Sequence, residues 1–307
     1  MIKCNNSYYR SLPTGEAAFF IAFHKQNIMK NLITRSITGI LFVAVILGAI
    51  WYSQVSFRGL ILITTILCLL EFYRLVNENI SRWILYGDIL GGTYLVGVLF
   101  LIPNMQSGLP AIYTFIPYLI YLLYSFIIRL YLKEENPIAS WGHSFLGQVY
   151  IALPLGLLSF IAYPPLAAEY LLMPYNALLV IAFFSFIWIN DTGAYIVGCT
   201  IGKHRLFERI SPKKSWEGFF GGLAFSLLLG WVWSTQCSFL NMGQWIGLSA
   251  VVSIFSTWGD LCESLLKRTL NVKDSGNILP GHGGLLDRLD SVFLASPATV
   301  IYLYLLS

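Results

Sequence analysis

Residues 264–290, SLLKRTLNVKDSGNILPGHGGLLDRLD, are a highly polar stretch in an otherwise apolar chain, and Asp260 and Glu263 stand just before them. The stretch also contains four glycines, and its charged or titratable residues are Lys267, Arg268, Lys273, Asp274, His282, Asp287, Arg288 and Asp290. A charge beside a bilayer costs free energy unless it is paired or solvated, so this density indicates a functional site. A solvated loop with cytoplasmic positive charge is the alternative. It accounts for the Lys and Arg residues but leaves the aspartates at both edges unexplained.

The composition of the 307-residue chain is that of a polytopic membrane protein. Hydrophobic residues make up 57% and charged residues 11%, whereas soluble domains carry about 25% charged residues. Membrane topology explains the net charge of +4 better than nucleic-acid binding does, so we expect no nucleic-acid partner. The five cysteines are scattered without metal-binding spacing and are interpreted as small apolar fillers.

Nine apolar segments precede and follow the polar stretch, and they predict an all-α transmembrane bundle of about nine helices. Their expected ranges are 37–53, 57–76, 83–102, 111–132, 145–163, 175–198, 217–236, 244–266 and 289–306. The third contains Asp88 together with Gly87, Gly91 and Gly92, so it is compatible with one helix or with two short pieces. We find no internal repeat and no soluble domain, and we expect residues 29–307 to form a single integral-membrane domain.

Residues 1–28 differ from the rest of the chain. Their apolar run, 17–23, falls short of the about 20 residues needed to span a bilayer. They also lack a small-residue cleavage site typical of signal peptides. We interpret them as an N-terminal extension, either disordered or the product of a mis-assigned start codon, because Met29 begins a sequence typical of membrane proteins.

The basic residues predict the orientation of the bundle. Cytoplasmic loops collect Lys and Arg, and nine spans place all of the 19 basic residues except Arg58 on one side. The N-terminus is therefore expected in the cytoplasm and the C-terminus outside. The polar loops between the sixth and seventh spans and between the eighth and ninth should share the cytoplasmic face.

Carboxylates stand where the eighth and ninth segments meet the polar stretch. Asp260 lies inside the eighth segment on the helix face of Lys267, and Asp287 and Asp290 lie three residues apart at the start of the ninth. Oxygen ligands without a Cys or His cluster suit Mg²⁺. Two alternatives remain open: an ion pair of Lys267 with Asp260 or Glu263, and a favourable placement of acids at a helix N-terminus.

Further polar groups could bind phosphate. The glycine-rich turn 280–284 offers backbone N–H groups at close range, and Asp191 is an acid inside the sixth segment whose burial favours a functional role. Lys213 and Lys214 would attract a polyphosphate, with ordinary cytoplasmic positive charge as an equal alternative, and Ser211 is a candidate cap for the seventh helix. The glycines near Asp191 are interpreted as helix-packing positions. Together these groups indicate metal-dependent transfer between a phosphorylated soluble compound and a lipid.

Residues 264–290 resemble the signature of CDP-diacylglycerol synthases (phosphatidate cytidylyltransferases). The matching positions are Ser264, Lys267, Arg268, Lys273, Asp274, Gly276, Leu279, Pro280, His282, Gly283, Gly284, Asp287, Arg288 and Asp290. Residues 190–195, 202–203 and 211–218 resemble the family's second motif region. The resemblance covers about residues 185–300, is only compositional over 29–184, and does not include 1–28.

The resemblance implies conversion of CTP and phosphatidic acid to CDP-diacylglycerol and pyrophosphate by a homodimer. It implies a site within residues 185–300 that faces the cytoplasm from a bacterial inner (plasma) membrane. It also implies Mg²⁺ held by Asp260 and Asp287, with Asp290 supporting or sharing the site, and a monovalent cation such as K⁺ nearby.

We assign roles to these residues as hypotheses. The catalytic set is Asp260, Asp287, Lys267 and Asp290. The substrate-binding set is Lys213, Lys214, Ser211, Ser264, Arg268, Lys273, Asp274, His282, Gly283, Gly284, Arg288 and Asp191. The attacking phosphatidate oxygen is already ionised near pH 7, so His282 is expected to form hydrogen bonds in the loop rather than act as a base.

Two other functional classes compete with this interpretation. A transporter predicts charges at the membrane midplane and often inverted repeats, whereas here the charges gather near one face and no repeat is visible. A different lipid-linked transferase, such as one joining a sugar phosphate to a polyprenyl phosphate, would share the acids and Mg²⁺.

Overall fold

The computed structural model describes residues 36–77, 80–104, 112–132, 134–164, 175–276, 278 and 283–307. The predicted extension, residues 1–28, lies outside the described residues, as does His282. The helices along the chain are Ser36–Tyr52, α2 (Gln54–Val76), α3 (Arg82–Leu101), η2 (Ile102–Asn104), α4 (Ile112–Leu132), α5 (Pro137–Gly147), η3 (Gln148–Ala152), α6 (Leu153–Ala162), α7 (Ala177–Ile201), α8 (Trp216–Gln236), α9 (Met242–Thr269) and α10 (Leu286–Leu305). Strands β1 (Arg205–Phe207) and β2 (Ser211–Ser215) form a small antiparallel hairpin between α7 and α8.

The predicted all-α membrane bundle is confirmed. By length and composition, seven helical segments of the described chain can cross a membrane: α2, α3, α4, the continuous stretch Pro137–Ala162, α7, α8 and α9. The shorter apolar helix Ser36–Tyr52 and α10 coincide with the first and ninth predicted segments. The count of nine spans and the cytoplasmic N-terminus stay predictions. The third segment, which sequence left open, is the single helix α3.

Helices α5, η3 and α6 follow one another without a break, so the fifth segment begins earlier than predicted. Pro137 occupies the first turn of α5 and the side chain of Asn136 accepts the N–H of Ala139, so the chain turns into helix before its most apolar part. A five-residue π-helical stretch, Gln148–Ala152, joins α5 to α6.

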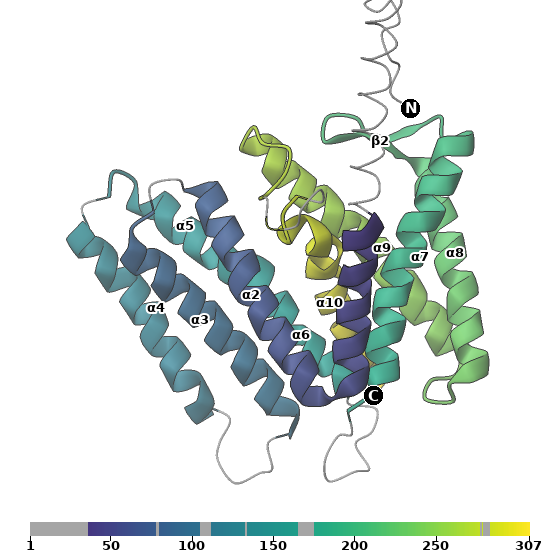
Figure 1. The fold of residues 1–307 in the computed structure, drawn as a ribbon, viewed down its shortest axis with the longest axis horizontal. Coiled ribbons are helices and arrows are strands. Elements are labelled where there is room, and N and C mark those ends of the chain that lie inside the picture. Colours follow the sequence, from purple (N-terminus) through teal and green to yellow (C-terminus); the bar gives the residue numbers. More distant parts are fainter. Residues whose placement is uncertain are drawn as a thin grey trace, which may run out of the picture.

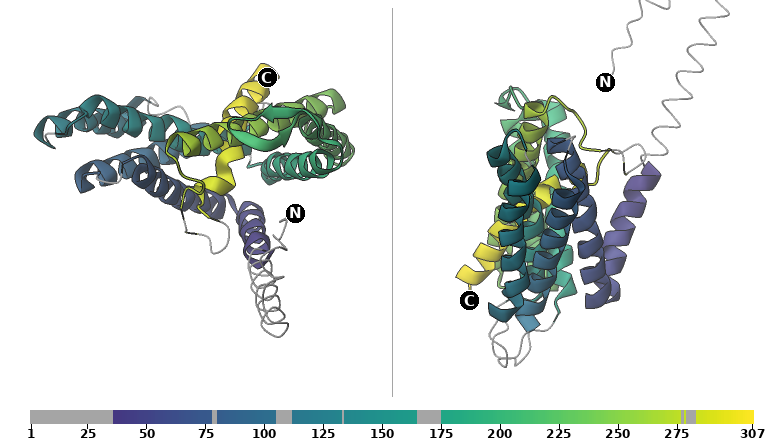
Figure 2. Two further views of the ribbon diagram at one scale, coloured as in Figure 1. Left: turned by 90° about the horizontal axis from the view of Figure 1, so that it is seen from above. Right: turned by 90° about the vertical axis from the view of Figure 1, so that its left-hand side faces the viewer.

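The helices form two groups joined through α10. In Figure 1, α3 and α4 lie at one side next to α2 and α5, and α7, α8 and α9 lie at the other. Helix α10 packs extensively on α9 in the second group. It also contacts α6, which packs on α3 in the first group, so α10 connects both groups. The helix Ser36–Tyr52 stands on one face of the bundle, as both views of Figure 2 show. The buried core runs through both groups and includes Phe72, Phe183 and Phe293.

Glycines bring α7 and α8 into close contact, as predicted for the small residues below Asp191. A Cβ atom at Gly218 would lie 2.9 Å from the carbonyl oxygen of Ala194, and one at Gly222 would lie 2.6 Å from that of Asn190. Only glycine permits this backbone approach. The close packing fixes where α7 presents Asp191 relative to the start of α8.

The hairpin β1–β2 covers the end of α7 and α8 where α9 also ends (Figure 1). Ser215 caps α8, because its hydroxyl oxygen accepts the N–H of Gly218 at 3.1 Å. The prediction that Ser211 caps this helix was therefore wrong: Ser211 begins β2, and the chain stays extended for four more residues before the helix starts. Glu217 accepts the backbone N–H groups of Lys203 and His204, which ties the start of the hairpin to the first turn of α8.

Candidate active site

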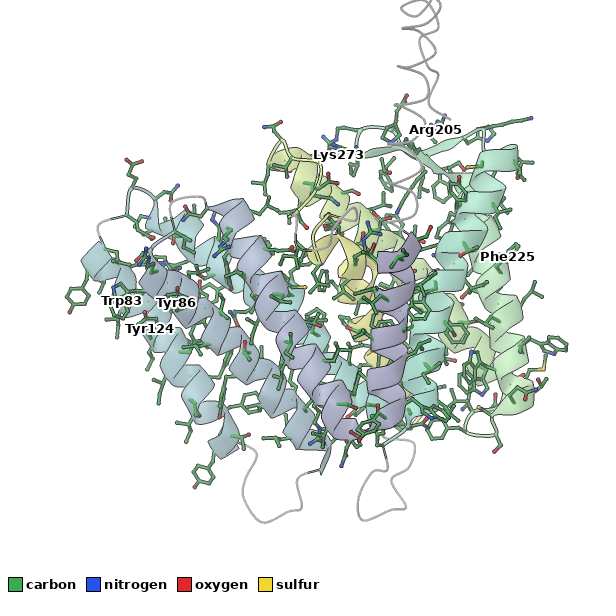
Figure 3. The ribbon with its side chains drawn as sticks, in the orientation of Figure 1. Trp83, Tyr86, Tyr124, Arg205, Phe225 and Lys273 are labelled. Carbon is green, nitrogen blue, oxygen red and sulfur yellow. The ribbon has the colours of Figure 1, made fainter. Side chains whose placement is uncertain are left out.

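Helix α9 brings a set of charged residues to the hairpin end of the bundle. A capping box between Asn241 and Gln244 starts the helix, and Lys267 and Arg268 occupy its last turn, where positive charge suits the helix dipole. The guanidinium Nε of Arg268 donates to the carbonyl oxygen of Ile210 in the hairpin at 3.5 Å. Figure 3 shows Arg205 of the hairpin and Lys273 of the loop after α9 at this same end. The two polar loops therefore share one end of the bundle, as predicted.

Lys267 connects α9 to the start of α10. Its ammonium nitrogen lies 2.6 Å from Glu263 Oε2, one turn earlier, and 2.7 Å from Asp287 Oδ1. Glu263 is fully buried and Asp287 nearly so, and the attraction between opposite charges is stronger in such surroundings than in water. Of the two ion pairs left open for Lys267 by the sequence, the one with Glu263 forms.

The second carboxylate oxygen of Asp287 organises the loop before α10. Asp287 Oδ2 accepts the N–H of Ser275 at 3.0 Å and the N–H of Gly284 at 2.9 Å. Gly283 has a positive φ of 84°, and a Cβ atom there would lie 2.8 Å from Asp287 Oδ2. Glycine is needed at this position because L side chains rarely adopt that backbone conformation. The backbone N–H of Gly284 thus already has Asp287 as its hydrogen-bond acceptor.

Asp260 pairs with the hairpin rather than with Lys267. Lys214 Nζ, from β2, lies 2.6 Å from Asp260 Oδ2, and the hydroxyl of Ser264 donates to Asp260 Oδ1 at 3.2 Å. Both partners of the ion pair keep about a quarter to a third of their side chains exposed. A solvent-accessible pair of this kind contributes about 0–1 kcal/mol to stability, so an incoming anion can compete for Lys214.

Four aspartates line one cavity of about 340 Å³, which we call the aspartate cavity: Asp191, Asp260, Asp287 and Asp290. They come from α7, α9 and α10. The helix Ser36–Tyr52 closes another side with apolar residues, including Phe42 and Ile46, and Arg288 also contributes to the lining. The cavity therefore joins an acidic wall to an apolar wall.

A second cavity of about 300 Å³, which we call the lysine cavity, lies between α7, the hairpin and α8. Lys213 and Lys214 line it, together with Ser215. Asp191 and Asp260 belong to its lining as well as to that of the aspartate cavity. The two cavities thus share these two carboxylates, with basic side chains on one side and further acids on the other.

The donor chemistry of the aspartate cavity fits Mg²⁺, which prefers carboxylate oxygens and is usually held by one or two of them plus substrate phosphates. Within the described residues, no group of three or more His, Cys, Asp or Glu side chains is arranged to hold a metal ion. Lys214 and Lys267 engage one oxygen each of Asp260 and Asp287. The assignment of Asp260, Asp287 and Asp290 to Mg²⁺ stays a prediction, with room for an ion in the cavity that they line.

The structure separates the remaining candidates into two groups. Ser264 contacts Asp260 directly, and Gly283 and Gly284 shape the turn around Asp287. Lys273, Asp274 and Arg268 are exposed at the end of the bundle, outside the lining of either cavity. Ser211 lies in β2, three positions before Lys214.

Sequence reasoning missed one residue that touches this site. The buried carboxylate of Glu71, on α2, accepts the backbone N–H of Leu286 at 2.9 Å. Its signal was an acid inside an apolar segment, the same signal that drew attention to Asp191. Glu71 lies outside residues 185–300, where the motif resemblance is confined.

The fold and the site define a multi-pass membrane protein with a carboxylate-rich polar site at one end of its helical bundle. The chain belongs to the cytidylyltransferase family, whose model matches residues 33–306. It is 48% identical over 122 residues to a phosphatidate cytidylyltransferase of Staphylococcus aureus (strain COL), and 49% identical over the same length to one of Staphylococcus haemolyticus (strain JCSC1435). In both comparisons the match covers 39% of this chain and 46% of the relative, so the chain spans about half the length of these curated relatives.

Proposed function

We propose that this chain transfers a cytidylyl group from CTP to phosphatidic acid, giving CDP-diacylglycerol and pyrophosphate. One observation carries the proposal: Asp191 and Asp260 are shared by an acidic cavity with an apolar wall and a cavity lined by two lysines. This arrangement suits a polyphosphate and a lipid phosphate that meet at carboxylates. Membership of the cytidylyltransferase family and the names of the relatives support it.

The reaction needs no strong base. An ionised oxygen of the phosphatidate phosphate attacks the α-phosphorus of CTP and forms the new P–O bond. The bond from the α-phosphorus to the oxygen that bridges to the β-phosphorus breaks, and pyrophosphate leaves with that electron pair. Mg²⁺, held by Asp260 and Asp287 with Asp290 in support, would neutralise the negative charge of the phosphates. A monovalent cation such as K⁺ is proposed beside it.

The lysines position the nucleotide and respond to its arrival. Lys213 and Lys214 attract the triphosphate to the lysine cavity. The triphosphate competes with Asp260 for Lys214, and the exchange frees Asp260 Oδ2, which the ion pair otherwise engages at 2.6 Å. Lys267 keeps Asp287 oriented through their contact of 2.7 Å.

The lipid substrate reaches the site from the bilayer. Apolar side chains of the helix Ser36–Tyr52 line the aspartate cavity, and they suit the acyl-chain end of phosphatidic acid. We propose a bacterial inner (plasma) membrane with the site facing the cytoplasm, where CTP is available, and a homodimer as the working form.

An assay of the full-length protein in lipid nanodiscs tests the proposal. With phosphatidic acid, CTP and Mg²⁺ present, we expect release of one pyrophosphate for each CDP-diacylglycerol formed, and loss of turnover when any of the three is omitted. UDP-sugars with polyprenyl phosphate serve as the matched comparison for the rival lipid-linked transferase. Turnover with those substrates and none with CTP would overturn the proposal.

A further inference from the structure

Glu71 is a buried acid that the reaction described above does not use. It lies on α2, and only 6% of the residue is exposed. Within the described residues, its Oε1 atom is buried without a hydrogen-bond partner. Keeping a carboxylate in such a position costs free energy that an apolar side chain would not. The contacts of Glu71 with the start of α10 indicate a structural role that accounts for this cost.

The first turn of α10 depends on Glu71 for a hydrogen-bond acceptor. The first four N–H groups of a helix lack partners within the helix, and Leu285, at the N-cap position of α10, supplies no side-chain cap. Glu71 Oε2 accepts the N–H of Leu286, the first residue of the helix, across 215 positions of sequence. Its negative charge also suits the positive end of the helix dipole.

The loop before α10 is shaped around the Glu71 carboxylate. A Cβ atom at Gly276 would lie 2.5 Å from Glu71 Oε1, and one at Gly284 would lie 2.7 Å from Glu71 Oε2. The neighbouring Ser275 and the same Gly284 donate their backbone N–H groups to Asp287. The loop therefore packs against Glu71 on one side and binds Asp287 on the other.

We propose that Glu71 is a positioning residue that caps α10 from α2 and so aims Asp287 and Asp290 into the aspartate cavity. This role rests on the proposed function as far as turnover is concerned, whereas the cap itself does not. Glu71 links the amino-terminal helices, which lie outside the motif resemblance, to the helix that begins with two of the four aspartates.

The experiment compares Glu71→Ala, Glu71→Gln and the wild-type chain in nanodiscs. Thr65→Val is the matched control, because Thr65 is also buried on α2 but its hydroxyl bonds only within its own helix, to Ile61. Hydrogen exchange of the peptide 283–290 reports on the cap. Steady-state kinetics report kcat and the KM for CTP, and thermal unfolding reports on overall stability.

We expect Glu71→Ala to speed exchange of this peptide about tenfold and to lower kcat about tenfold, with the KM for CTP changed less than about twofold. Glu71→Gln should recover most of kcat because its amide oxygen still accepts the N–H of Leu286. Unchanged exchange in Glu71→Ala, or equal effects of Thr65→Val, would overturn the cap. A wild-type chain without CTP-dependent turnover would overturn the proposed function instead, and the exchange comparison would still decide the cap.

Discussion

Two regions of this protein bury acids and bases within the helical bundle, and they do so in different ways. Among α3, α4 and α5, Arg129 and Asp88 are each almost fully buried, 3.9 Å apart. Arg129 donates to Ser125 and Ser140, and Asp88 accepts from Tyr121 and Ser144. Arg129, Asp88 and these hydrogen-bond partners, which we call the Arg129 cluster, line neither cavity of the candidate site.

The charges at the hairpin end are arranged for exchange of partners. Lys214 and Asp260 hold each other at 2.6 Å while both border cavities. Lys267 is shared between Glu263 and Asp287. The contrast teaches that burial of a charge does not identify a functional site in a membrane protein. A charge whose partners are complete serves the fold, whereas one beside a cavity can take a ligand.

The largest expected effect is a loss of activity with little change in stability. Asp260→Asn or Asp287→Asn should lower kcat by about 10²–10³-fold, because each removes a carboxylate that we propose as a ligand of the Mg²⁺ that would neutralise the phosphates. Pyrophosphate release measures the rate, and Mg²⁺ binding by calorimetry gives a second readout. Thermal unfolding within a few degrees of wild type would show that the fold is intact. A near-normal rate in either variant, together with weak or absent Mg²⁺ binding by the wild-type chain, would remove the metal assignment.

A substitution in the Arg129 cluster should have the opposite outcome, a loss of stability with little change in activity. Arg129→Met leaves Asp88 buried without its cation, which costs about 3–5 kcal/mol of stability. Thermal unfolding in detergent should show the loss, while kcat per folded molecule stays within about twofold of wild type. If kcat fell strongly without loss of stability, the Arg129 cluster would belong to the catalytic apparatus and the contrast would fail.

The smallest expected effect is on the KM for CTP. It tests whether the lysines of the site bind CTP through their position in the lysine cavity or only through positive charge, which other residues of the same hairpin also carry. Lys214→Gln should raise the KM for CTP about tenfold, because the triphosphate loses a partner in the lysine cavity. Arg209→Gln is the matched control, since Arg209 is exposed in the turn of the hairpin and lines neither cavity. Equal effects of both variants would mean that only the overall positive charge attracts CTP.

Local patterns predicted most of the helices and many of the site's residues. The apolar segments matched helices because hydropathy over about 20 residues is a property of each segment alone. The motif spacing identified Lys267 and Asp287, and Asp260 was recognised as an acid inside an apolar segment. The structure places all three around one site. Ser211 was misassigned as a cap because it begins the short strand β2, which runs to Ser215 before α8 starts, and nothing in the apolar pattern marked that strand.

The sequence by itself determined a membrane-spanning helical bundle, the end of it that carries the polar site, and the acids and bases found there. Only the tertiary structure decided which charge pairs with which: Lys214 with Asp260, Lys267 with Glu263 and Asp287, and Glu71 with the start of α10. The reason is physical. Hydropathy and motif spacing are local along the chain, whereas a charge chooses among partners by distance and burial, which are set when distant helices pack together.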